Sequence, residues 1–320
     1  MAVVEGDGWA GLGPEGWRDH ALIRDRLERG ADPHVCGSGR PLHLAALFGT
    51  PEVVAELARR VDDVDAAEEG RPALWTAVLA NRADNARVLT AAGADPWRIV
   101  RADWSPGRLS LAGPTPGLFR VPVGERGLTP AESAAATEGR RLTAALGDLD
   151  VEGTGLACVA GIDAAEAARR LGAQPREDPE LDELLEDPLA HDMEESPRIV
   201  GATDVPGGCV VTQPWGSAPT MPGVQRLLSA GTVCYGLYAH PKSGAQGSVA
   251  RDGVIEGWDL HPGGDPDADD SSWEVLASYL YRDNAVAYAC AYVGLRPADA
   301  RAVTGPPDLW LKLPRRDYYP

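Results

Sequence analysis

The chain has 320 residues, of which 44% are hydrophobic and 24% are charged, and its formal net charge at pH 7 is −18. This length accommodates two ordinary domains. The negative charge argues against nucleic acids and anionic membranes as partners, because both would be repelled before contact. It favours a basic protein partner, or serves only to keep the protein soluble.

Other compositional features bear on location and cofactors. No stretch approaches the roughly 18 uninterrupted apolar residues of a membrane span, and Met1 to Asp7 lack the basic start and apolar core of a signal peptide. We therefore expect a cytoplasmic protein. The cysteines are odd in number, scattered and without CxxC spacing, so they predict neither disulfides nor structural zinc. The sequence indicates no cofactor.

The first third of the chain contains an internal repeat. The tetrapeptide Gly-Ala-Asp-Pro occurs at Gly30 to Pro33 and again at Gly93 to Pro96, and the run Pro41 to Ala46 has its counterpart 32 residues later at Ala73 to Ala77. This spacing is close to the period of about 33 typical of ankyrin repeats. On these motifs residues 17–146 resemble the ankyrin-repeat family. The resemblance implies an all-α ankyrin-repeat solenoid that binds other proteins.

His43 lies where that family usually has histidine, so we expect it to bond to neighbouring backbone rather than to act in catalysis. At the far end, Leu128 to Ala135 restarts the helical pattern as a terminal repeat. The segment 97–123 in between is much longer than an ordinary hairpin loop, and we interpret it as an insertion.

The insertion concentrates two residue types that dominate binding hot spots, Trp and Arg. Long loops in compact domains are commonly functional or disordered. We expect a partner-binding surface formed by Trp97, Arg98, Arg101, Trp104, Arg108 and Phe119. An alternative is that the aromatic residues fold back as a lid over the last repeat and seal the end of the stack.

A second domain is predicted over residues 155–313. Its pattern predicts an α+β domain in which an antiparallel sheet is covered by helices on one face. The expected strands are 156–162, 199–203, 209–213, 232–239, 247–250 and 254–260, and the expected helices are 164–171, 220–230, 273–282, 284–294 and 297–303. Asp252-Gly253 is a favoured two-residue hairpin turn.

Parts of this domain resemble a family common in actinobacteria that has no assigned function. The matching segments are Cys158 to Leu171, Trp215-Gly216, Gln225 to Thr232 and Glu256 to Asp259. This resemblance supplies no catalytic motif that could be transferred to the chain.

Whether the chain is an enzyme is left open by the sequence. Nucleophile elbows, P-loops, HExxH and GxGxxG motifs are missing in the required strand-to-helix context. Candidates for acid or base chemistry are His240, His261 and Glu256. They could share a ligand pocket with Trp215, Tyr235, Tyr238 and Trp258.

Two acidic segments are candidate sites. Asp265 to Asp270 imitates the start of a calcium loop but lacks its glycine and its bidentate glutamate, so we expect no metal. Residues 177–195 are the most acidic part of the chain, and their leucines have helical spacing. They predict an amphipathic helix with an acidic face, or an exposed connector.

The leading functional hypothesis is a protein that binds a basic partner through its repeats and the inserted loop. One version is an immunity or regulatory protein that neutralises a basic toxin, because ankyrin repeats resemble those of bacterial immunity proteins. The alternative is a small-molecule enzyme or ligand-binding protein of bacterial specialised metabolism, with its pocket in the C-terminal domain.

Overall fold

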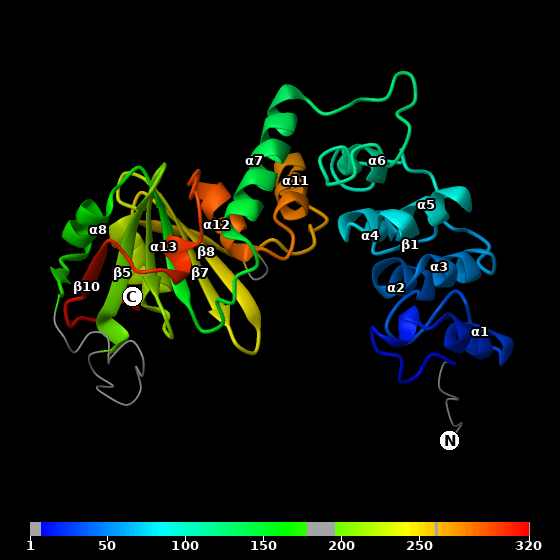
Figure 1. Cartoon of the computed structure of the whole chain (residues 1–320), viewed down its shortest axis with the longest axis horizontal. Helices are drawn as coiled ribbons and strands as arrows, with labels where there is room; N and C mark the ends of the chain where they lie inside the picture. Colours follow the sequence, from blue (N-terminus) through cyan, green and yellow to red (C-terminus); the bar gives the residue numbers. More distant parts are fainter. Residues whose placement is uncertain (1–7, 178–195, 260–261, 320) are drawn as a thin grey trace. The chain divides into compact units, whose positions relative to one another are not determined.

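The computed structural model describes residues 8–177, 196–259 and 262–319 (Figure 1). The chain divides into two compact units. The first combines Met1–Ala136 with Pro266–Tyr279, and the second combines Thr137–Asp265 with Leu280–Pro320. A short segment from late in the sequence therefore completes the first unit.

The first unit is mainly a stack of short helices. Figure 1 shows them following one another in chain order from α1 to α6. Their bounds are η1 Gly16–Arg18, α1 His20–Glu28, α2 Pro41–Phe48, α3 Pro51–Ala58, α4 Ala73–Leu79, α5 Ala83–Ala91 and α6 Pro106–Ser110. Helix α7 (Pro130–Leu146) begins in this unit, and α11 (Ser272–Leu280) belongs to it up to Tyr279.

Local sequence explains where these helices begin and how closely they pack. Proline occupies the first helical position of α2, α3 and α6, where its missing N–H costs nothing. Ala45, Ala46 and Ala77 are fully buried between neighbouring helices. Their small side chains allow the helices to approach closely, and α2 and α4 are in direct contact.

Short hairpins alternate with the helix pairs. Strands β1 (Ala67–Glu68) and β2 (Arg71–Pro72) pair in antiparallel fashion, and single bridges join Cys36 to Gly39 and Arg101 to Trp104. The expected fold class, an all-α solenoid followed by an α+β domain, is therefore wrong. The first unit contains paired β-strands and bridges between its helix pairs, so it is not all-α. It also includes the segment Pro266–Tyr279 from the later part of the chain.

The second unit is built on one eight-stranded antiparallel sheet of order β4-β10-β5-β6-β3-β7-β8-β9. The strands are β3 Gly155–Ala160, β4 Gln174–Pro175, β5 Ile199–Val205, β6 Gly208–Gln213, β7 Val233–His240, β8 Gly244–Arg251, β9 Val254–Asp259 and β10 Leu309–Lys312. Strands β4 and β10 were missing from the sequence prediction. The turn at Asp252-Gly253 is present, with both residues at positive φ.

Helices cover both faces of this sheet rather than the one face expected. Alternate residues of a strand point to opposite faces. Ala157 and Val159 pack into the core cluster that contains residues of α8 (Ala164–Leu171) and α10 (Pro222–Leu228). Between them in sequence, Cys158 faces the other way and contacts Cys290 of α12 (Ala285–Val293), with 3.7 Å between the sulfur atoms. Helix α13 (Arg301–Thr304) replaces the longer helix expected over 297–303.

Candidate functional site

Two of the predicted partner-binding residues are internal to the first unit. The Trp104 side chain is fully buried and its Nε1 donates a hydrogen bond of 2.8 Å to the carbonyl oxygen of Ser272. Arg108 is only 4% exposed, and its guanidinium lies 4.1 Å from the centroid of the Trp104 ring. Trp104 and Arg108 therefore make contacts inside the first unit, and Trp104 joins its own segment to α11.

The Arg108 guanidinium is held by two carboxylates. Its Nη2 donates to both Glu132 oxygens, at 2.7 and 2.8 Å, and its Nη1 donates to Asp103 Oδ2 at 3.0 Å. Glu132 also accepts the Thr129 N–H at 2.7 Å, closing the capping box at the start of α7. Arg108 therefore joins α6 to the beginning of α7.

The other residues of the predicted surface lie closer to solvent. Trp97 and Phe119 are half-buried, and Arg98 is exposed. Arg101 is half-buried, and its Nη2 donates to the carbonyl oxygen of Glu69 at 2.6 Å. The structure thus separates Trp97 and Arg98, which reach the surface, from Trp104 and Arg108, which do not.

Three hairpin turns form a connected row in the first unit. They are Cys36–Gly39, Glu68–Arg71 and Arg101–Trp104, and we call them the hairpin row. The first turn meets the second where the Arg40 N–H donates to Glu68 Oε2 at 3.3 Å. The second meets the third through the bond from Arg101 to Glu69.

The hairpin row carries apolar side chains that the sequence analysis missed. Val35 is 57% exposed beside the first turn, and Ile99 is 65% exposed beside the third. The Gly-Ser-Gly run at 37–39 was the signal for the first hairpin, because such clusters mark turns. The third turn was hidden within the presumed insertion.

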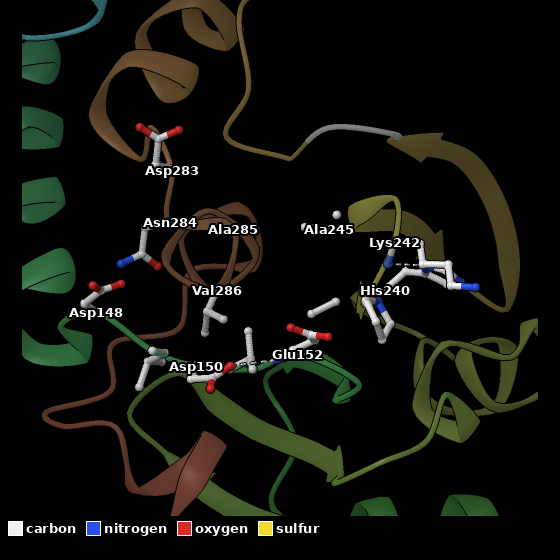
Figure 2. A pocket seen from close by; sticks show the side chains of 15 residues that line it. Asp148, Asp150, Glu152, His240, Lys242, Ala245, Asp283, Asn284, Ala285 and Val286 are labelled. Carbon is white, nitrogen blue, oxygen red and sulfur yellow. Dashed lines mark hydrogen bonds between the residues drawn. The ribbon is translucent and has the colours of Figure 1, made fainter. Parts of the chain in front are cut away.

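The second unit contains a pocket of about 420 Å³. It lies between the segment 148–152, the connection from β7 to β8, and the start of α12. Figure 2 shows Asp148, Asp150 and Glu152 spread along one edge, from the side of Asn284 to that of His240, with Lys242 beyond His240. Among the predicted catalytic and pocket residues that the structure describes, His240 alone lines this pocket.

The hydrogen bonds of His240 define its chemistry. Its Nδ1 accepts the backbone N–H groups of Lys242 and Ser243, at 3.1 and 3.2 Å. In the neutral ring this network assigns the proton to Nε2, which can only donate. The neutral imidazole therefore offers an N–H donor at Nε2.

The remaining candidates of the second unit lie apart from the pocket lining. Glu256 pairs with Arg251 at 3.1 Å, and Trp215 and Trp258 are 68% and 65% exposed. Tyr235 is fully buried and donates to Asp259 Oδ2 at 2.8 Å. Burial and the neighbouring carboxylate raise the pKa of Tyr235 well above its usual value.

Tyr238 is half-buried, and its ring meets that of His240 edge-on with 5.8 Å between the centroids. His261 and nearly all of the acidic segment 177–195 lie outside the described residues. His43, in contrast, binds neighbouring backbone as expected, because its Nε2 lies 2.8 Å from the carbonyl oxygen of Arg71. Burial lowers the pKa of His43.

Within the described ranges, the structure contains no cluster of three or more His, Cys, Asp or Glu side chains arranged to hold a metal ion. The helices of those same ranges include none that is long and apolar enough to traverse a bilayer. No protein-family model matches the chain, and comparison with curated proteins finds no relative.

Proposed function

We propose that the chain is an interaction protein whose hairpin row binds a partner protein. The observation that supports this most is the hydrogen bonding of each turn to the next through the side chains of Glu68 and Arg101, which links the turns that carry exposed Val35 and Ile99. Preorganised backbone lowers the entropy lost on binding, and apolar side chains on it can enter partner pockets.

The charges around the hairpin row favour a basic partner. The exposed acidic residues beside the turns are Asp32, Asp62, Asp63, Glu69 and Asp95, and the exposed basic one is Arg98. Complementary charge speeds encounter and loses its effect at high salt. In the immunity form of this proposal, the partner is a basic toxin domain.

The test combines Val35→Ser with Ile99→Ser in the full chain. The wild-type protein is immobilised in extracts of the cells that produce it, and a stoichiometric partner is identified, purified and titrated. We expect the double variant to bind at least about 10-fold more weakly, since each buried apolar side chain contributes on the order of 1 kcal/mol.

Tyr319→Ser is the matched control, because Tyr319 is a 72% exposed apolar residue of the second unit. It should leave the affinity unchanged. Equal affinity of wild type and the double variant for the purified partner would contradict the proposal, as would the recovery of no partner from the extract.

A second function is supported by the pocket beside His240. Its volume is within the range of about 300–1,000 Å³ for small-molecule sites. The Nε2–H of His240 supplies a hydrogen-bond donor. The test is a screen of small molecules against the intact chain, in which binding is detected as a rise in melting temperature. A ligand that raises the melting temperature of His240→Phe as much as that of the wild type would argue against this role.

A further inference from the structure

Strand β9 forms one edge of the large sheet. In the described chain it pairs with β8 alone, so the backbone groups on its outer side face no other strand. Its side chains are also accessible, since Val254 is 61% exposed and Trp258 is 65% exposed. Such an edge can accept another extended segment through backbone hydrogen bonds.

A β-bulge interrupts β9. Ala250 lies opposite Ile255 and Val249 lies opposite Gly257, so Glu256 is the additional residue. Residues opposite one another in an antiparallel pair point to the same face of the sheet. Ile255 and Trp258 therefore share the face covered by α10, because their partners are Ala250 and Ser248, and Gln225 of α10 bonds Ser248 at 2.6 Å.

The rest of β9 points to the opposite face. Val254, Gly257 and Asp259 pair with Arg251, Val249 and Gly247, which alternate with the residues of the α10 face. Glu256 belongs with them, because its carboxylate reaches Arg251 at 3.1 Å. The usual alternation of side chains between the two faces of the sheet is therefore interrupted at the centre of β9, where the consecutive residues Glu256 and Gly257 lie on the same face.

We propose that two copies of the chain associate by antiparallel pairing of their β9 strands. When an irregular strand pairs with itself, most registers place residues of opposite faces against each other. One register avoids this at all six positions. It places Val254 opposite Asp259, Ile255 opposite Trp258 and Glu256 opposite Gly257, with the two-fold axis between residues 256 and 257.

The side chains suit this register. Each Trp258 meets the partner's Ile255, and aromatic and β-branched pairs stabilise antiparallel strands. Each Glu256 meets the partner's Gly257, and a Cβ added at Gly257 would have no atom within 4 Å in the single chain. The register therefore gives each Glu256 side chain room beside the partner's Gly257.

Charge sets the conditions under which the dimer forms. Each chain has a formal net charge of −18, so two copies repel each other at long range. Salt screens that repulsion, whereas backbone hydrogen bonds and apolar contacts are little affected by it. Association should therefore strengthen as salt rises, the opposite of the expectation for binding to a basic partner.

The test is sedimentation equilibrium of the full-length protein from roughly 1 µM to 1 mM, at low and high salt. We expect a reversible dimer for wild type and at least a 10-fold weaker one for Trp258→Lys and for Gly257→Val. Tyr319→Lys changes the same charge at another exposed aromatic residue and should dimerise as wild type does. A monomer throughout, or a dimer insensitive to both β9 variants, overturns the proposal.

Disulfide trapping tests the register and does not depend on the variants above. In this arrangement the two residues at position 256 have Cα atoms about 6 Å apart, within disulfide range, and those at position 254 are offset by about 17 Å along the strands. Mild oxidation should cross-link Glu256→Cys and leave Val254→Cys monomeric. Equal cross-linking of both, or of neither, contradicts the register.

Discussion

At the scale of single residues, residue type alone did not decide whether a side chain recognises a partner or stabilises the fold. Trp and Arg are enriched in binding hot spots, but a buried arginine that is paired with carboxylates, or a buried tryptophan whose N–H finds an acceptor, stabilises the fold instead. Arg108 is of the second kind, since its guanidinium lies between Trp104 and two carboxylates.

Replacing Arg108 should therefore destabilise the first unit. Arg108→Met retains much of the side-chain volume but leaves Glu132, itself 17% exposed, without its cation. Breaking a buried pair in this way costs about 3 kcal/mol. Urea denaturation would measure the change, with Arg120→Met, at an exposed arginine of the same segment, as the control. A loss below about 1 kcal/mol would show that the pair is unimportant for stability.

The same carboxylate predicts a dependence on pH. Burial acts to raise the pKa of Glu132, but hydrogen bonds from Thr129 and Arg108 outweigh it, and the pKa lies below the ordinary value of 4.5. A carboxylate with a depressed folded-state pKa stabilises the protein above its unfolded-state pKa and loses that effect as pH falls through the folded-state pKa. The stability difference between wild type and Glu132→Gln should be constant near neutral pH and should decline below about pH 4.5. A difference that grew on acidification would contradict this assignment.

At the scale of elements, glycine positions allow large side chains to enter the sheet. Gly247 of β8 makes room for the buried Tyr235 ring, because a Cβ there would lie 2.1 Å from the tyrosine oxygen. The hydrogen bond from Tyr235 to Asp259 connects β7 to β9 across β8. This packing depends on a residue without a side chain in the middle strand.

Gly247→Ala should accordingly destabilise the second unit by about 2 kcal/mol through overpacking. Pairing it with Tyr235→Phe should recover part of the loss, since the clashing oxygen is then removed. Thermal unfolding of the two single variants and the double variant provides the measurement. Gly117→Ala is the control, because a Cβ there would have no atom within 4 Å. Strictly additive losses in the double variant would refute the proposed clash.

At the scale of the whole molecule, the first unit is discontinuous in sequence. Trp104 bonds Ser272, and the Tyr279 hydroxyl donates to Asn81 Oδ1 at 3.2 Å. Both contacts join the stack of helices to the segment Pro266–Tyr279 within the same unit. The early part of the chain alone is therefore an incomplete unit.

A fragment ending at residue 150 should be markedly less stable than the first unit of the intact chain. Without α11, the fully buried Trp104 would be exposed and its Nε1 would lose its partner. A synthetic peptide of residues 266–280 should bind the fragment and restore protection of its amides from hydrogen exchange. Unchanged protection with and without the peptide would show that α11 is dispensable.

Some helix ends and tight turns were predicted correctly, because they depend on interactions between residues close together in the sequence. Asp163 caps α8 by accepting the Glu166 N–H at 2.7 Å, and Gly172 ends that helix at positive φ, so α8 occupies the range 164–171 that the sequence predicts. The hairpin at Asp252-Gly253 also followed from turn chemistry. The pocket beside His240 was only partly predicted, because its acidic residues come from the segment 148–152, which carries no motif.

The sequence by itself determined the repeat spacing, the position of α8, several strands of the sheet and the excess of acidic residues, since each follows from neighbouring residues or from composition. The tertiary structure alone decided that Trp104 and Arg108 are buried, that helices cover both faces of the sheet, and that α11 completes the first unit. These features depend on contacts between residues far apart in the chain, and local patterns carry no information about which distant surface a side chain will meet.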